Sequence, residues 1–208
     1  YEIRNCDWSS DVCSSDLALM GDEFRIEDRI VAYQYREGRD LSGYLDGTAN
    51  PDGDDASAAA LLDGAYEGSS FVSTQRWIHD FEALGRMTDA ERDQIVGRRI
   101  SDNEEIAEAP ESAHVKRTAQ EDVGVLLRRS MPWGGIGGAG LAFVAYSRDP
   151  DTFLAHGQRM IGAADGILDA MLRISRPVTG ALYWCPPVVD GKLHLPGRER
   201  RTETWEDG

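Results

Sequence analysis

The amino-acid sequence predicts an α+β fold of the ferredoxin-like type, a split βαβ arrangement in which an antiparallel sheet carries its helices on one face. Stretches rich in β-branched, aromatic and aliphatic residues have the length and composition of strands at 70–78, 123–129, 141–147 and 178–184. Helical signals separate the first stretch from the second, and the third from the fourth. The order strand, helix, strand, strand, helix, strand is that of the split βαβ motif.

Two short helical segments follow the first strand. Residues 80–84 begin in a helical pattern. Thr88, with Glu91 three residues later, is a capping-box signature that predicts a helix ending near residue 96. Residues 98–122 are polar and lack a regular period, so we expect them to connect elements rather than to form one.

The second half of the motif is a hairpin and a long helix. The glycine-rich stretch 131–140 is expected to turn the chain between the two central strands. It is not a phosphate-binding loop, because no helix begins after it and no Lys-Ser or Lys-Thr pair follows. Asp149 and Pro150 predict the start of a helix over 151–174, which Pro177 ends before the last strand.

The start of the chain needs separate treatment. Residues 1–17 have no apolar periodicity, and residues 7–17 look like the translation of a common sequencing-library adapter. We therefore interpret residues 1–17 as artefactual and disordered, and exclude them from the fold prediction. Cys185 is then the single remaining cysteine, so the sequence supports neither a disulfide nor a cysteine metal site.

The remaining 191 residues are expected to divide unequally. Residues 18–66 are predicted to hold a strand near 30–35, the remnant of a missing N-terminal domain, followed by a glycine-rich loop. Residues 67–188 are predicted to be the ferredoxin-like domain. Residues 189–208 are polar and contain Pro and Gly, which predicts a loose C-terminal tail.

The composition excludes two kinds of partner. The net charge is −15 and no basic stripe is present, which argues against a nucleic-acid-binding protein. No run of about 18 apolar residues occurs, so no membrane-spanning helix is predicted. The hydrophobic fraction of 41% suits a globular protein with its own core.

The most informative segment is GYLDGTANP, residues 43–51. It places the carboxylate of Asp46 between Gly43 and Gly47, which permit backbone angles and close approaches that other residues do not tolerate. Pro51 then ends any helical tendency. Two interpretations remain open from these residues: a simple turn, or an acid–base group aimed at a planar cofactor.

Two further segments contain candidate functional residues. His114 lies in ESAHVKR, an irregular segment in which it is followed by a β-branched residue and two cations. Arg128 and Arg129 end a predicted strand, and strand alternation places them on opposite faces. Two interpretations stay open: both are solvated at the strand end, or one guanidinium is buried and stabilises negative charge. Structural or solvated roles fit the other histidines, which are His79, His156 and His194.

Three motifs together resemble those of the dye-decolorizing (DyP-type) haem peroxidases. GYLDGT, SAHVKR and LRRSMPWG are similar to that family's GxxDG signature, its proximal-histidine segment and its distal strand. RWIHDF, IVGRR and AMLRISRPVTGALY look like further family segments, so the resemblance covers residues 24–188. It implies that this chain is the C-terminal half of a two-domain, dimeric-α/β-barrel-type peroxidase, the half that binds most of the haem.

The resemblance implies an iron ligand on one side of the haem. His114 would bind the iron through Nε2, and its Nδ1–H would be donated to an acceptor that strengthens the ligand. Asp169, which we expect on the helix 151–174, is the candidate acceptor. Asp165 is the alternative.

The resemblance also implies an acid–base pair on the opposite side. Asp46 would take a proton from hydrogen peroxide and return it to the departing oxygen, while Arg128 would offset the developing negative charge. Gly47 would let the backbone pass close to the porphyrin, Ser130 would occupy a hydrogen-bonding position, and Arg98 would pair with a haem propionate.

The function implied is a peroxidase with heme b that reduces hydrogen peroxide and oxidises a small organic donor of the dye or phenol type. The resemblance further implies a cytoplasmic protein that forms a homo-oligomer at full length. Two alternatives stay open: a non-catalytic haem-binding or haem-trafficking module of the same fold, and a ferredoxin-like interaction domain without a cofactor.

Overall fold

A computed structural model describes residues 29–190 and 192–195, and an antiparallel sheet lies at its centre. The chain divides into two units between Ile30 and Val31, and every described helix and strand belongs to the second. The strands are β1 (Ser70–His79), β2 (Leu127–Arg128), β3 (Met131–Gly135), β4 (Gly138–Ser147), β5 (Ser175–Cys185), β6 (Val188–Val189) and β7 (Lys192–Leu193). The α-helices are α2 (Gly53–Ala60), α3 (Phe81–Arg86), α4 (Asp89–Val96), α5 (His114–Arg117), α6 (Gln120–Val123) and α7 (Pro150–Met160). Short 3₁₀ helices are η2 (Arg36–Gly38), η3 (Gly64–Tyr66) and η4 (Ala170–Arg173).

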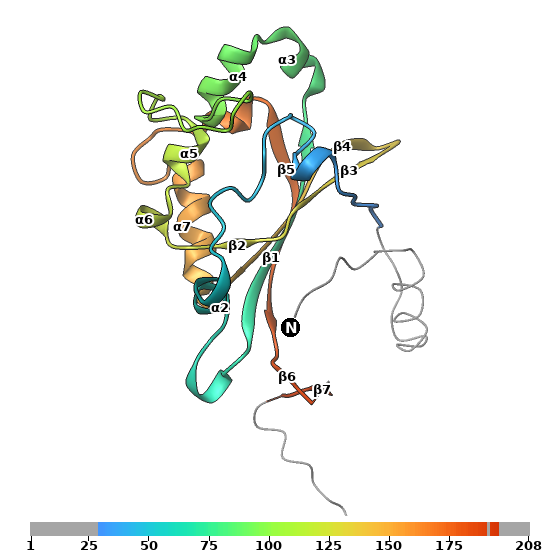
Figure 1. Ribbon diagram of the computed structural model, residues 1–208, viewed down its shortest axis with the longest axis vertical. Coiled ribbons are helices and arrows are strands. Elements are labelled where there is room, and N and C mark those ends of the chain that lie inside the picture. The colour runs from blue at the N-terminus through green and yellow to red at the C-terminus, as the bar shows by residue number, and fades with distance from the viewer. Residues whose placement is uncertain (1–28, 191, 196–208) are drawn as a thin grey trace, which may run out of the picture. The chain divides into compact units, whose positions relative to one another are not determined.

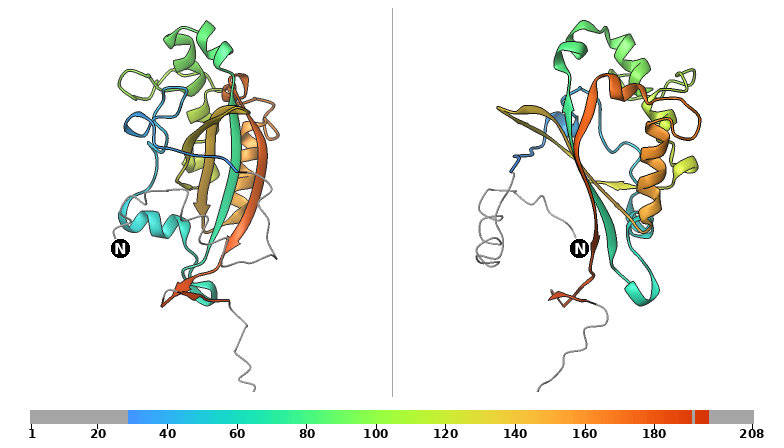
Figure 2. Two further views of the ribbon diagram at one scale, coloured as in Figure 1. Left: turned by 90° about the vertical axis from the view of Figure 1, so that its right-hand side faces the viewer. Right: turned by 180° about the vertical axis from the view of Figure 1, so that it is seen from behind.

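The sheet has the strand order of the predicted fold. Its hydrogen-bonded order is β2-β4-β1-β5, and β3 pairs with β4 beyond the end of β2. All of these pairings are antiparallel. Figure 1 and the two views of Figure 2 show α7 lying along one face of the sheet. With β2 and β3 taken together as the second strand of the motif, the predicted ferredoxin-like α+β fold is confirmed.

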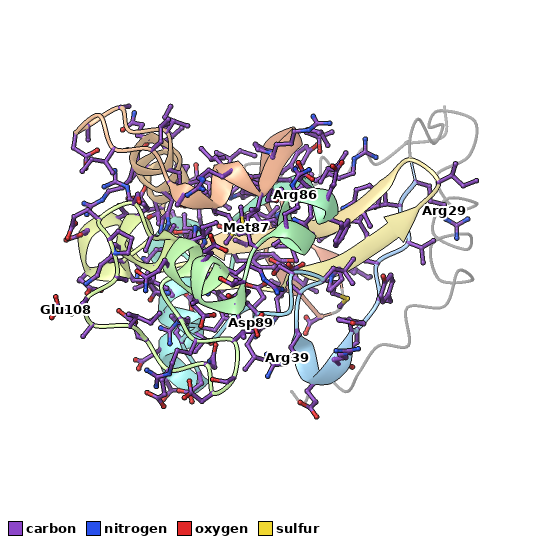
Figure 3. The ribbon with its side chains drawn as sticks, turned by 90° about the horizontal axis from the view of Figure 1, so that it is seen from above. Arg29, Arg39, Arg86, Met87, Asp89 and Glu108 are labelled. Carbon is purple, nitrogen blue, oxygen red and sulfur yellow. The ribbon has the colours of Figure 1, made fainter. Side chains whose placement is uncertain are left out.

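A small apolar core joins α3 and α4 to η4 and to Ile174, the residue before β5. The buried cluster consists of Leu84, Ile95, Ala170 and Ile174, with Met87 and Met171 packed against it. Figure 3 shows Met87 in the connection between α3 and α4. Burying one large aliphatic side chain contributes about 1.5–3 kcal/mol, so this cluster fixes α3, α4 and η4 against one another.

The capping box that the sequence predicts fixes the start of α4. The Thr88 hydroxyl accepts a hydrogen bond from the Glu91 N–H, and the Glu91 carboxylate accepts one from the Thr88 N–H. The helix ends at Gly97, whose φ of 88° lies in the left-handed region. Both ends of α4 are therefore set by local chemistry.

The long helix expected over 151–174 is wrong in its second half. α7 ends at Met160, and the chain then turns through Gly162 (φ 70°) and Gly166 (φ 78°). A Cβ at Gly162 would lie 3.0 Å from backbone atoms of Ile167, so the turn needs glycine there. A separate 3₁₀ helix, η4, follows, and Asp169 is its N-cap rather than a residue of a long helix.

The strand expected over 123–129 is also wrong. Its first residue ends the short helix α6, Gly124 turns the chain with a φ of 91°, and β2 contains only Leu127 and Arg128. The glycine-rich stretch that follows is not a loop throughout. β3 and β4 extend into it, and Gly135 pairs with Gly138 to leave a two-residue hairpin turn.

The ends of the chain differ from expectation where they are described. The strand expected near 30–35 is reduced to one isolated bridge between Ala32 and Trp133, because η2 begins at Arg36. The tail expected to be loose from residue 189 starts with the β6–β7 hairpin. The expectations for residues 1–28 and 196–208 lie outside the described residues. None of the helices in the described ranges has the length and apolar character needed to span a bilayer.

Candidate functional site

The loop 43–51 is shaped by two glycines and one buried tyrosine. Gly43 and Gly47 have φ values of 98° and 78°, which side chains rarely tolerate. The Tyr44 hydroxyl donates a 2.6 Å hydrogen bond to Asp93 of α4. Burial, and then this hydrogen bond, raise the pKa of Tyr44 above its usual range, so the phenol keeps its proton. The loop therefore has a fixed course before it reaches Asp46.

Asp46 and Arg128 meet at the end of this loop. One carboxylate oxygen of Asp46 accepts a 2.8 Å hydrogen bond from the Gly47 N–H and lies 3.4 Å from Nη1 of Arg128. Both side chains are only partly exposed. Arg129 is exposed, as alternation along the strand predicts for one of the two arginines. The structure thus brings together the carboxylate and the guanidinium that the sequence analysis singled out.

Asn50 joins the loop to Arg128, and the sequence analysis missed it. Its amide nitrogen donates to the Arg128 carbonyl at 2.9 Å, and its amide oxygen accepts from the Arg128 N–H at 2.9 Å. The side chain therefore acts as a strand partner for the two-residue strand β2. An asparagine before a proline reads as an ordinary turn residue, so no local signal reveals this contact.

His114 lies at the start of α5 and faces a buried carboxylate. Its Nδ1 lies 2.7 Å from Oδ2 of Asp169, whose side chain is 0% exposed, while the His114 side chain is 24% exposed. An ionised carboxylate can only accept, so we assign the proton to Nδ1. The lone pair of a neutral ring is then on Nε2, which has no hydrogen-bond partner within the described part of the chain. This is the tautomer that ligates metals through Nε2.

Asp165, the alternative partner of His114, is used elsewhere. Both of its carboxylate oxygens accept hydrogen bonds from the buried guanidinium of Arg117, at 2.7 and 2.8 Å. The hydrogen bond from Arg117 lowers the pKa of Asp165. Arg117 also donates to the Arg159 carbonyl of α7, so this pair ties α5 to the segment that carries Asp169.

The neighbours of His114 require a close backbone approach. A Cβ at Gly97 would lie 2.3 Å from Cγ2 of Val115 and 3.2 Å from Cβ of Ala113, the two residues that flank His114. Only glycine at the end of α4 lets the His114 segment pack this tightly. The position of His114 is therefore set from three directions: α4, α7 and η4.

Arg98 and Ser130 make local contacts. The Arg98 guanidinium donates to the Asn103 carbonyl at 3.1 Å and to the Glu105 carboxylate at 2.8 Å, both within its own loop. The Ser130 hydroxyl accepts from the Val144 N–H at 3.3 Å in the gap between β2 and β3. The structure does not bring these two side chains into contact with His114, Asp46 or Arg128 in the described residues.

His156 of α7 is a further histidine near the site. Burial lowers its pKa, a hydrogen bond between Nε2 and the Gly124 carbonyl at 2.9 Å raises it, and the positive charge of Arg128 lowers it. The pKa of His156 is lowered overall, so the ring is neutral at pH 7. Because the charge of Arg128 acts on it, His156 lies within electrostatic reach of the Arg128 side of the site.

The donor set fits a porphyrin metal better than a metal held by protein alone. The described residues contain no group of three or more His, Cys, Asp and Glu side chains that could hold a metal ion. A metal at His114 would need most of its ligands from another molecule, as a porphyrin supplies. A hollow of about 660 Å³ lies beside the end of the loop, between Asn50, α2 and the start of α7. Neither His114 nor Asp46 lines it, so it adjoins the candidate site without being that site.

Comparisons with known proteins show the family to which this fold belongs. A family model described as "Dyp-type peroxidase, C-terminal" matches residues 37–190. The "Dye-decolorizing peroxidase" of Mycobacterium tuberculosis is 30% identical over 184 residues, which cover 83% of this chain and 55% of that protein. The chain thus spans about half the length of the curated relatives it matches.

Solved structures are similar as well. The dye-decolorizing protein from V. cholerae is 30% identical with a TM-score of 0.78, covering 86% of this chain and 63% of that one. A variant of DypB from Rhodococcus jostii RHA1, solved in complex with heme, is 30% identical with a TM-score of 0.79, covering 85% and 61% of the two chains.

Proposed function

Since this chain belongs to the Dyp-type peroxidase family, we propose that it is the haem-binding part of a peroxidase that reduces hydrogen peroxide. The observation that carries the proposal is the pairing of His114 with the buried carboxylate of Asp169, which leaves Nε2 free to bind iron. The contact between Asp46 and Arg128 supports the catalytic part of the proposal.

The proposed cofactor is heme b, with His114 as its protein ligand. When bound, heme b supplies an iron centre that takes oxidising equivalents from peroxide and passes them to a second substrate. Asp169 would hold the His114 ring in one tautomer and make Nε2 a stronger donor. Gly47 would allow the loop to lie close to the ring plane. Arg98 remains our candidate for a propionate and Ser130 for a polar contact.

Asp46 would move the proton in the peroxide step. One carboxylate oxygen would accept a proton from one oxygen of hydrogen peroxide and return it to the other oxygen, which leaves as water. Acid–base help of this kind is worth about a hundredfold to ten-thousandfold in rate. The Arg128 guanidinium, 3.4 Å from Asp46, would offset negative charge that develops while the O–O bond breaks.

The second substrate, the cellular location and the oligomeric state are proposed by analogy with the family. The second substrate would be a small organic electron donor, a dye or a phenol, and the full-length protein would be a cytoplasmic homo-oligomer. A non-catalytic haem-binding module is the competing function, and the residues on the Asp46 side distinguish the two.

Reconstitution with hemin tests the proposal in two steps. We expect a Soret band that His114→Ala abolishes, while His194→Ala, a change at an exposed histidine, leaves it intact. A Soret band unchanged by His114→Ala would overturn the iron-ligand assignment. Peroxide-dependent dye oxidation should then be lost in Asp46→Ala and Arg128→Ala; full activity in both would overturn the catalytic roles and leave haem binding alone.

A further inference from the structure

A second buried histidine–carboxylate pair lies at the base of the loop that carries Asp46. Nε2 of His79, the last residue of β1, lies 2.9 Å from Oδ2 and 3.0 Å from Oδ1 of Asp40. Nδ1 of His79 lies 2.8 Å from the hydroxyl of Ser175, the first residue of β5. The side chains of His79 and Asp40 are 6% and 11% exposed. These contacts therefore connect the end of β1 and the start of β5 to Asp40, which lies just before the loop 43–51.

Asp40 in turn closes the first turn of that loop. Its N–H donates to the Tyr44 carbonyl at 2.8 Å, and its carbonyl accepts from the Gly43 N–H at 2.9 Å. Its carboxylate also accepts from the Ser42 N–H at 3.0 Å. Arg39 supports the same turn, because its guanidinium donates to the Gly43 carbonyl at 2.7 Å. Figure 3 shows Arg39 on the segment that leads into the turn.

The charge of Asp40 fits a role as an anchor. Burial raises the pKa of Asp40, but the hydrogen bond and charge of His79 and the donors of Ser42 outweigh it, so the pKa lies below the usual value. The carboxylate is therefore ionised at neutral pH and accepts the proton on Nε2 of His79. Without His79 this buried carboxylate would keep only the Ser42 donors, so loss of His79 should weaken the anchor.

Asp40, His79 and Ser175 are the residue types of a nucleophilic triad, but their setting differs. Ser175 is 5% exposed, and it does not line the hollow beside Asn50. A nucleophile must reach a substrate, so the buried hydroxyl does not support hydrolytic chemistry. The three side chains form an internal tie between β1, β5 and the loop.

We propose that His79 and Asp40 are positioning residues for Asp46, a role in the reaction that rests on the proposed peroxidase function. The turn 40–44 is locked to the sheet by this pair, and Asp46 follows it by two residues. Asn50 ties the other end of the loop to Arg128. Asp46 is thus held between two fixed points, and releasing the first moves its carboxylate relative to Arg128.

The experiment compares His79→Phe with His79→Gln, whose amide can still donate to Asp40. In the haem-free chain, amide hydrogen exchange at residues 42–47 should speed up about tenfold in His79→Phe and much less in His79→Gln. Exchange in β4 should stay close to that of the parent chain. Unchanged exchange at 42–47, or an equal rise across the sheet, would overturn the proposal.

The haem-loaded chain gives the second measurement. His79→Phe should keep the Soret band and lose roughly a hundredfold in kcat for peroxide, with His79→Gln recovering part of the loss. An unchanged kcat in His79→Phe would overturn the positioning role. Failure of the parent chain to bind haem would instead overturn the proposed function, while the hydrogen-exchange result still decides whether the pair holds the loop.

Discussion

The two sides of the candidate site are built in different ways. The ring of His114 is hydrogen-bonded to a buried carboxylate, Asp169, which is itself fixed as the N-cap of η4. Asp46 lies on a loop and meets Arg128, a partner that is partly exposed. The course of that loop is set at its ends, by Asp40 before it and Asn50 after it.

The two sides therefore control different properties, the donor strength of a ligand atom and the position of a reacting group. A short hydrogen bond from a buried carboxylate sets the tautomer and donor strength of one ring atom. A loop tied at both ends sets where a group lies, and small displacements of a reacting group change rates strongly. A change at Asp169 should therefore act on stability and on the donor strength of His114, whereas a change at Asp46 itself should act on the rate.

The largest effect should come from Asp46→Asn, which keeps the size of the side chain and removes its ability to take a proton. The rate with hydrogen peroxide should fall by about a hundredfold to ten-thousandfold, and the Soret band should stay in place. Stopped-flow kinetics of the hemin-loaded chain measures both. Asp54→Asn, at an exposed carboxylate in the first turn of α2, is the matched control. A rate within about threefold of the parent chain would end the acid–base assignment.

The next largest effect should be a loss of stability on the His114 side of the site. Asp169→Ala removes the buried partner of His114 and the N-cap of η4, whose side chain accepts from the Met171 N–H at 2.8 Å. The loss of a charged hydrogen bond and a cap should cost about 3 kcal/mol in the free energy of unfolding. Urea unfolding of the haem-free chain measures it. Asp169→Asn keeps the cap acceptor and should cost less; if Asp46→Ala destabilises as much as Asp169→Ala, the contrast between the two sides is wrong.

A smaller effect is expected at the far end of the loop. Asn50→Ala leaves the N–H and carbonyl of Arg128 without their side-chain partner and should cost about 2 kcal/mol. Gln120→Ala is a suitable control, because within the described residues this partly buried amide makes a single hydrogen bond to the loop, to the Ala49 carbonyl at 2.7 Å. Equal unfolding midpoints for the two variants would show that Asn50 does not tie the loop to β2.

Elements with a strong local signal could be predicted from the sequence. The capping box at Thr88 and Glu91 sets α4, and the apolar runs set β1, β4 and β5 close to where they lie. The helix expected over 151–174 failed, because left-handed glycines at 162 and 166 override an apolar pattern that continues past them.

The residues of the site, too, could be predicted only where their local sequence is distinctive. Asp46, His114 and Arg128 could be proposed because each lies in a distinctive motif, and the contact expected between His114 and Asp169 is present. Asn50 and the His79–Asp40 pair were missed as functional candidates. Asn50 meets Arg128 across 78 residues and His79 meets Asp40 across 39, and neither local sequence indicates a partner.

The smallest effect is a pH dependence of the loop anchor. The pKa of Asp40 is lower in the folded chain than its usual value of 3.8, so near and below that pH the unfolded chain binds more protons. The stability that Asp40 contributes is fully present above pH 3.8 and is lost as the pH falls through the lower, folded pKa. Asp40→Asn should therefore be less stable than the parent chain at pH 6, and the difference should shrink at pH 3. Urea unfolding at the two pH values measures it; a difference that stays constant or grows toward acid would mean that Asp40 is not held as an ion by His79, and that the Asp46 side lacks the fixed point that distinguishes it.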